Sequence, residues 1–211
     1  MKRFPDIYTE RGQDASSSVV QPATLVAEAK SRRRSSLVIY AALELRLAIE
    51  QLLSTIIVLS QENVDEQAVQ ECRKKDGLFP VLERAAPEYS KRCRFANVLS
   101  SFYPEIPQVA EWDVRSMKRY YTALSDLCHS QLEIRGMDAA PARWDERIRL
   151  LEDVYGFLEE GMKKGTGSLS IKGAPPFVVD WWGKFSSGEL TLESVHARFA
   201  LAKPVLDRRL T

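Results

Sequence analysis

The sequence has few of the side chains that build metal sites. It contains two histidines, His129 and His196, and three cysteines, Cys72, Cys93 and Cys128, with no CxxC pair and no cysteine–histidine cluster. Zinc sites take four ligands at short spacings, so we predict no metal site. No phosphate-binding motif is present either, and we predict no cofactor. The odd number and wide spacing of the cysteines indicate free thiols in a reducing compartment.

The sequence also lacks an excess of charge and any long apolar run. Its 30 basic and 29 acidic side chains give a formal net charge of +1, so no global field attracts nucleic acid. The longest apolar run, residues 37–43, is far shorter than the roughly 20 residues that cross a bilayer. The first residues lack the apolar stretch of a signal peptide. We therefore predict a cytoplasmic protein that does not associate with a membrane.

What the sequence does contain is a series of helical segments. Residues 24–60 hold neither glycine nor proline, which predicts one long helix that begins at Thr24, or two helices joined near residues 35–36. No segment shows sustained period-two alternation, so no major strand is expected. We predict an all-α helical bundle, whose further helices cover residues 64–75, 80–86, 87–102, 108–135, 142–163 and 190–203.

Composition divides the chain into three parts. Residues 1–22 are polar and are predicted to form a mobile N-terminal arm. Residues 23–164 are predicted to form the bundle. Residues 165–211 form a C-terminal extension rich in glycine, proline and tryptophan, with one terminal helix that stops at Pro204 and with residues 168–172 as a candidate short strand.

Aromatic residues gather in this extension, and they allow two interpretations. The favoured one is that they fasten the extension to its own domain, because a segment rich in glycine and proline needs large apolar contacts to become ordered. The other is a partner-binding anchor, since tryptophan is enriched at the centres of interfaces. The candidate anchor residues are Trp181, Trp182 and Phe185.

Two predicted helices carry polar residues at the edge of an apolar face. Arg46 lies at the margin of the apolar face of its helix, and Glu50 follows one turn later on the same flank. The two form a surface ion pair or line a polar groove. His129 lies just outside the apolar face of the 108–135 helix. It is either a hydrogen-bonding residue between helices or a general base or phosphate ligand.

These two helices carry a resemblance to a known family. The segment ALELRLAIEQL, residues 42–52, together with YYTALSDLCH, residues 120–129, resembles helical-bundle proteins of the HEPN superfamily. The resemblance covers about residues 37–60 and 117–132. It implies a HEPN-like bundle that binds or regulates, in a bacterial defence, toxin–antitoxin or stress system. It also implies association with RNA or with a protein encoded nearby, and a homodimer.

The chain departs from the pattern of the nucleases in that superfamily. Those enzymes carry an arginine and a following histidine separated by four to six residues on one helix, whereas the nearest arginines before His129 are Arg119 and Arg115, both too far away. His196 has no nearby upstream arginine. A ribonuclease of the usual kind is therefore not expected. The alternative is a metal-independent ribonuclease or nucleotide-chemistry enzyme that uses His129 with an arginine from another helix or subunit, with Arg46 and Glu50 as candidate catalytic partners.

Two short basic clusters are candidate nucleic-acid contacts. The favoured interpretation is that they are solvated helix faces. The alternative is that they contact phosphates and together line one groove. The residues in question are Lys30, Arg32, Arg33 and Arg34 in the first cluster, and Lys91, Arg92 and Arg94 in the second.

Overall fold

The computed structural model describes most of the chain as α-helix. It describes residues 17–60, 66–72, 74, 77–103, 108–129, 136–137, 140–164 and 174–210. Within these ranges every regular element is a helix and no strand occurs, which confirms the all-α prediction. The greater part of the predicted arm and the candidate strand at 168–172 lie outside these ranges. No helix among the described residues is long and apolar enough to cross a membrane.

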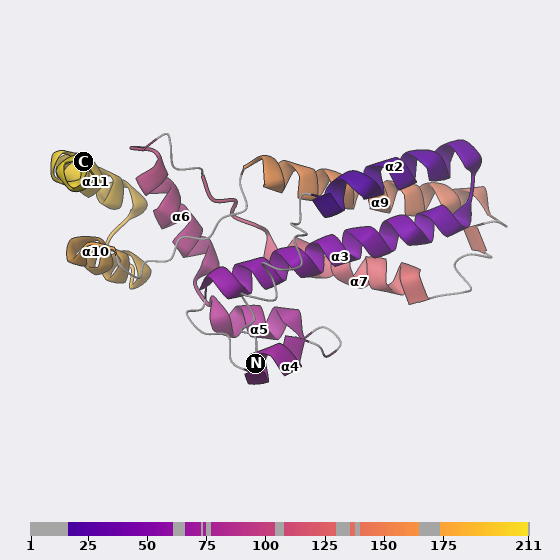
Figure 1. Cartoon of the computed structure of the whole chain (residues 1–211), viewed down its shortest axis with the longest axis horizontal. Helices are drawn as coiled ribbons and strands as arrows, with labels where there is room; N and C mark the ends of the chain where they lie inside the picture. The colour runs from indigo at the N-terminus through magenta and orange to yellow at the C-terminus, as the bar shows by residue number, and fades with distance from the viewer. Residues whose placement is uncertain are drawn as a thin grey trace.

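Four helices form an elongated bundle (Figure 1). They are α2 (Ser17–Arg32), α3 (Ser35–Ser60), α7 (Val114–His129) and α9 (Pro141–Lys163). Helix α3 lies at the centre and contacts α2, α7, α9 and also α5. Its side chains Leu45, Ile49 and Leu52 are completely buried. A helix that is apolar around most of its circumference is stable only when neighbours cover it, which explains the central position of α3.

The first two helices differ in one boundary from the prediction. They are joined at Arg33, close to the predicted junction, and Arg33 adopts the left-handed conformation with φ 47°. The first helix, however, begins at Ser17 and not at Thr24. Residues 17–22, assigned to the arm from their polar composition, are therefore helical. Pro22 lies inside this helix as its sixth residue, so the helix lacks the hydrogen bond that an amide at this position would make to the carbonyl one turn earlier.

Three shorter helices follow α3. They are α4 (Glu66–Cys72), α5 (Leu78–Ala85) and α6 (Tyr89–Ser100), close to the three predicted segments. Helix α5 buries Phe79, Val81 and Leu82 against α3. Helix α6 leaves the bundle and leads toward the C-terminal helices (Figure 1).

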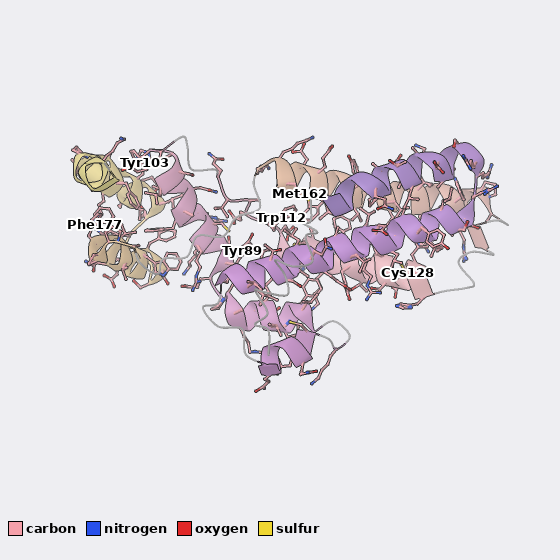
Figure 2. All side chains as sticks on the ribbon, viewed as in Figure 1. Tyr89, Tyr103, Trp112, Cys128, Met162 and Phe177 are labelled. Atoms are coloured by element: carbon pink, nitrogen blue, oxygen red, sulfur yellow. The ribbon has the colours of Figure 1, made fainter. Side chains whose placement is uncertain are left out.

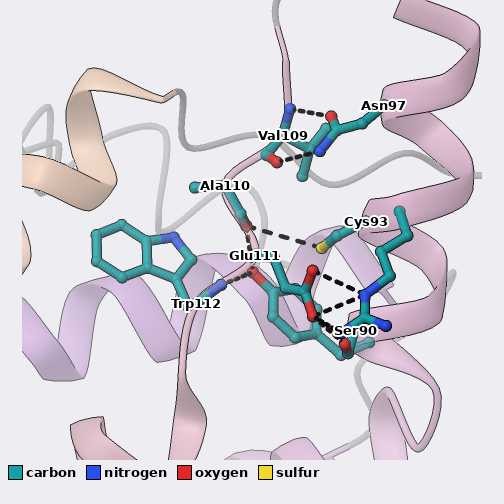
Figure 3. Close-up of polar contacts among 9 residues, drawn as sticks. Ser90, Cys93, Asn97, Val109, Ala110, Glu111 and Trp112 are labelled. Atoms are coloured by element: carbon teal, nitrogen blue, oxygen red, sulfur yellow. Dashed lines mark hydrogen bonds and ion pairs between the residues drawn. The ribbon is translucent and has the colours of Figure 1, made fainter.

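The start of α7 corrects the sequence prediction. The helix begins at Val114, and residues 108–113 are not helical. The side-chain amide of Asn97 on α6 holds this segment (Figure 3): its Nδ2 donates to the Val109 carbonyl at 2.9 Å, and its Oδ1 accepts from the Val109 amide at 2.7 Å. The Tyr89 hydroxyl donates to the Ala110 carbonyl at 2.8 Å. These contacts satisfy backbone groups that a helix would otherwise pair.

Asp113 sets the point at which α7 begins. Its carboxylate accepts from the Ser116 amide at 3.1 Å and from the Ser116 hydroxyl at 2.6 Å. This is the position and chemistry of a helix N-cap, which satisfies an otherwise unpaired amide. These hydrogen bonds hold the pKa of Asp113 below its ordinary value. Charge on the carboxylate therefore strengthens the start of the helix.

The C-terminal helices pack on α6 and form a second core. Helices α10 (Pro176–Ser186) and α11 (Leu192–Leu210) surround the completely buried Phe95 of α6. The sequence analysis expected no helix at 176–186. It also ended the last helix at Pro204, which lies inside α11. The other buried members of this core are Val98, Tyr103, Val178, Val195 and Phe199.

Helix α6 belongs to both cores. Tyr89, Cys93 and Ala96 face the main bundle, whereas Phe95 and Val98 face α10 and α11. The extension predicted to start at residue 165 therefore completes its core with a helix from the predicted bundle.

Candidate functional site

The structure brings Arg46, Glu50 and His129 together, with Tyr121 as a fourth member that was not predicted. Arg46 Nη1 lies 3.5 Å from His129 Nε2, and Arg46 Nη2 donates to the Tyr121 hydroxyl at 3.1 Å. Arg46 Nη2 also lies 3.0 Å from Glu50 Oε1. The Tyr121 hydroxyl in turn donates to Glu50 Oε1 at 3.0 Å. We call these four residues the Arg46 site.

Helix packing fixes the guanidinium in this site. Helices α3 and α7 lie side by side and run in opposite directions (Figure 1), so one side chain of α3 reaches two turns of α7. The Arg46 guanidinium carbon stands 5.1 Å from the centroid of the Tyr121 ring, in cation–π contact. The Tyr121 ring is held edge-on against Phe79 of α5, with centroids 5.6 Å apart. Arg46 is therefore fixed before any ligand arrives.

The members of the site differ in exposure. The side chains of Arg46 and Glu50 are 22% and 29% exposed, and Tyr121 is buried. His129 is exposed, so its imidazole is the group that solvent and ligands reach first. Burial raises the pKa of Tyr121, and the carboxylate of Glu50 acts in the same direction while Arg46 opposes it. The phenol therefore keeps its proton at neutral pH and serves as a hydrogen-bond donor.

Two polar atoms at the site have no hydrogen-bond partner among the described residues. They are Arg46 Nε and Ser125 Oγ, and both are buried. Ser125 lies one turn after Tyr121 and one turn before His129, on the same face of α7. An unpaired buried donor is costly, and because both atoms are covered by the surrounding side chains, the groups that face solvent here are His129 and the exposed parts of Arg46 and Glu50.

The chemistry available here is directed at an anion. An arginine supplies fixed N–H donors that suit a phosphate, and an adjacent imidazole can donate to the same group or move a proton. Among the described residues no group of three or more histidine, cysteine, aspartate or glutamate side chains could hold a metal ion. The nearby thiol of Cys128 is half-buried, and burial raises its pKa, so it stays protonated at neutral pH.

The first basic cluster is tied to carboxylates. Lys30 Nζ lies 2.7 Å from Glu152 on α9, and Arg32 Nε lies 4.0 Å from Glu28 one turn earlier. Arg33 forms the junction between α2 and α3, and Arg34 follows it. These side chains are exposed, but two of the four charges are already compensated within the fold.

The second basic cluster is also engaged. Lys91 contacts Glu88 and donates to the Ser186 carbonyl at 2.6 Å. The Arg92 guanidinium stands over the Trp182 ring at 5.9 Å, and Arg94 binds Glu111 through two nitrogens. The first cluster lies at the α2–α3 junction and the second lies on α6, near the opposite end of α3 (Figure 1), so the expectation that they line one groove is wrong.

The aromatic residues of the extension contact their own chain. The rings of Trp182 and Phe185 lie 5.5 and 5.9 Å from the ring of Phe95 on α6. Trp181 stacks edge-on against Phe199 of α11 at 5.1 Å. All three candidate anchor residues remain partly exposed. The favoured interpretation, in which these rings fasten the extension to the chain, agrees with these contacts.

A pocket of about 830 Å³ lies elsewhere, between the α5–α6 turn and the segment 108–113. Its walls include the carboxylates of Glu111 and Asp113, which are bound to Arg94 and Ser116 respectively. None of the buried unpaired polar atoms found among the described residues lines this pocket. We therefore place the candidate site at Arg46.

The hydroxyl of Tyr121 was not predicted as part of a site. The ring is apolar and falls on the buried face of α7, so its position in the sequence indicates a core residue. The sequence does hold a signal for this contact. A buried tyrosine hydroxyl needs a hydrogen-bond partner, and a charged residue on the facing helix can supply it.

Comparisons with models of protein families, with curated proteins and with solved structures gave no match.

Proposed function

We propose that this chain is a HEPN-like binding or regulatory protein that associates with RNA through the Arg46 site, in a bacterial defence, toxin–antitoxin or stress system. Two features support it. The two segments that resemble the superfamily are adjacent antiparallel helices. The observation that carries the proposal is the 3.5 Å approach of Arg46 Nη1 to the exposed imidazole of His129, because this pair can bind one phosphate from two sides.

Binding is favoured over catalysis for an electrostatic reason. The carboxylate of Glu50 lies 3.0 Å from Arg46 and compensates part of its charge. A guanidinium that already has an anionic partner stabilises less additional charge in a transition state. Tyr121 keeps its proton, so only His129 is left to move one within the site.

His129→Ala tests the proposal. Loss of a hydrogen bond to a phosphate is expected to weaken binding of a labelled single-stranded RNA about tenfold, or about 1.4 kcal/mol. Arg46→Gln is expected to weaken it further, since it removes a charge. Fluorescence anisotropy at fixed salt measures the affinity, and thermal unfolding verifies that each variant is folded.

The matched control is His196→Ala, which removes the other histidine from the exposed face of α11. It is expected to bind RNA as the unaltered protein does. If His129→Ala binds RNA normally and only lowers the thermal midpoint, His129 is structural and the proposal is wrong.

A metal-independent ribonuclease is the second candidate, and the same Arg46–His129 contact favours it. In that reaction His129 takes the proton of a ribose 2′-hydroxyl, the 2′-oxygen bonds to phosphorus, and the bond to the 5′-oxygen breaks as water protonates it. Incubation of labelled RNA with chelator separates the candidates. Cleavage that His129→Ala abolishes while binding persists supports the enzyme.

The homodimer is part of this proposal, and an exposed apolar stripe on α3 supports it. Tyr40, Leu43 and Leu47 lie on one face of α3 and are 59%, 39% and 39% exposed. The occupant we propose is a second copy of the chain. A two-fold axis between the two copies makes the same face of α3 contact itself in both copies. Antiparallel α3 helices centred on this stripe would then place Tyr40 of each copy beside Leu47 of the other, so that the exposed apolar side chains cover one another.

Leu47→Glu is therefore expected to produce a monomer. A charge in a desolvated apolar interface has no partner, so association should weaken by at least tenfold. Light scattering should give about twice the chain mass of 23.9 kDa for the unaltered protein and the single mass for the variant. Val179→Glu, at an apolar residue of α10 with 46% exposure, is the control and should leave the mass unchanged. A monomeric unaltered protein at micromolar concentration would contradict the homodimer.

A further inference from the structure

The exposed face of α7 carries a row of polar residues that ends at the Arg46 site. Arg115, Lys118, Thr122, Ser125 and His129 are spaced by three or four residues, so they share one face of the helix. Arg115 and Lys118 at the start of the row and His129 at its end are exposed cations and an exposed imidazole, Thr122 between them is exposed, and the Ser125 hydroxyl is buried. The row extends from the second residue of α7 to its last, and Figure 2 labels Trp112 just before this helix and Cys128 near its end.

The cations of this row differ from most of those in the two basic clusters. Lys30, Lys91 and Arg94 are all bound to carboxylates. Among the described residues, neither Arg115 nor Lys118 takes part in an ion pair. Lys118 stands 5.9 Å from the ring of Phe79 on α5 and has no carboxylate partner among those pairs. Charge that the fold leaves uncompensated is available to an external anion.

The anionic groups near the row are few and largely engaged. Asp113 caps α7 through Ser116, and Glu50 is bound to Arg46 and Tyr121. Asp126 lies on the flank of the row, a third of a turn from Ser125. Arg119, exposed on the same flank, contacts the Tyr120 ring at 5.0 Å and adds a further positive charge.

We propose that this face of α7 is a track for single-stranded RNA, which leads the strand to the Arg46 site. This inference rests on the proposed RNA association and names its substrate class and path. From residue 115 to residue 129 the helix rises about 21 Å at about 1.5 Å per residue. At about 3.4 Å per nucleotide of a stacked strand, that length accommodates about six nucleotides. A single row of cations follows one strand, whereas a duplex presents two strands that a single row cannot contact together.

The experiment measures RNA affinity against salt concentration. Each cation that contacts a phosphate of a single strand contributes about 0.7 to the slope of log affinity against log salt. Arg115→Gln/Lys118→Gln is therefore expected to reduce the slope by about 1.4 and to weaken binding at least tenfold at low salt. The probe is a fluorescein-labelled mixed-sequence RNA of twelve nucleotides, and shorter RNAs should lose affinity below about six nucleotides.

The control is Lys30→Gln/Arg94→Gln, which removes the same formal charge from ion-paired positions and should leave the slope nearly unchanged. Three results would overturn the track. They are an equal loss of RNA affinity in both double variants, an unchanged salt slope in Arg115→Gln/Lys118→Gln, and equal affinity of the unaltered protein for a duplex of the same length. If Arg115→Gln/Lys118→Gln binds RNA as the unaltered protein does, while His129→Ala still weakens binding, only the proposed track is wrong. If the unaltered protein binds no RNA, both proposals fail.

Discussion

Phe95→Ala is expected to lower the free energy of unfolding of the C-terminal unit by about 3–5 kcal/mol. The ring is completely buried in the second core. It contacts the rings of Trp182, Phe185 and Phe199 within 6 Å. Its removal leaves a cavity that three large aromatic side chains on two helices cannot close without moving, and aromatic pairing is lost in addition to buried area.

The effect is expected to be local, because α6 joins two cores. Its other face, at Tyr89, Cys93 and Ala96, remains packed on the bundle. In urea the α10–α11 unit should therefore unfold at lower concentration than the bundle. Fluorescence can separate the two, since Trp181 and Trp182 report the unit, and the remaining two tryptophans lie in or beside the bundle.

A version of the chain with Trp181→Phe and Trp182→Phe isolates the bundle signal. In that background Phe95→Ala should leave the bundle transition nearly unchanged. Val179→Ala on the exposed side of α10 is the control and should change stability by less than about 0.5 kcal/mol. A single transition shifted equally for all tryptophans would show that the two cores unfold together, against this division of α6.

A structural feature could be predicted from the sequence when the residues that determine it are close together along the chain. The long helices were predicted because their apolar spacing is a property of neighbouring residues. The meeting of Arg46 and His129 was also foreseen as one of two alternatives, since both residues lie at the edge of an apolar face. A polar residue at such an edge is directed toward the facing helix.

The features that were missed depend on distant residues. Residues 108–113 have no glycine or proline, so the helical pattern continues through them in the sequence. Their non-helical conformation is held by hydrogen bonds from Asn97 and Tyr89 on α6. Residues 176–186 are rich in aromatic and β-branched side chains, which have low helix propensity. Their helix is stabilised by packing against Phe95, which no local pattern can reveal.

Residues 108–113, which include Trp112, also explain the second large effect that we expect. Gly161→Ala on α9 should lower the free energy of unfolding by about 1–3 kcal/mol. A Cβ atom at residue 161 would overlap the Trp112 ring, which lies against the bare backbone of the glycine. Trp112 is 5% exposed and is also held edge-on against Phe157 at 5.6 Å, so it has little room to move.

Gly156→Ala is the matched control, because it makes the same change five residues earlier in the same helix. A Cβ atom there meets nothing within 4 Å. Alanine costs less backbone entropy than glycine in a helix, so this variant should gain about 0.5–1 kcal/mol. Urea unfolding of both variants measures the difference. Stability changes of opposite sign in the two variants support the close approach of Trp112 to α9, whereas stabilisation by both would show that residues 108–113 pack elsewhere.

Since Trp112 immediately precedes the Asp113 cap, a displaced ring should also weaken the start of α7. The RNA affinity of Gly161→Ala then reports whether the Arg46 site depends on the position of that helix.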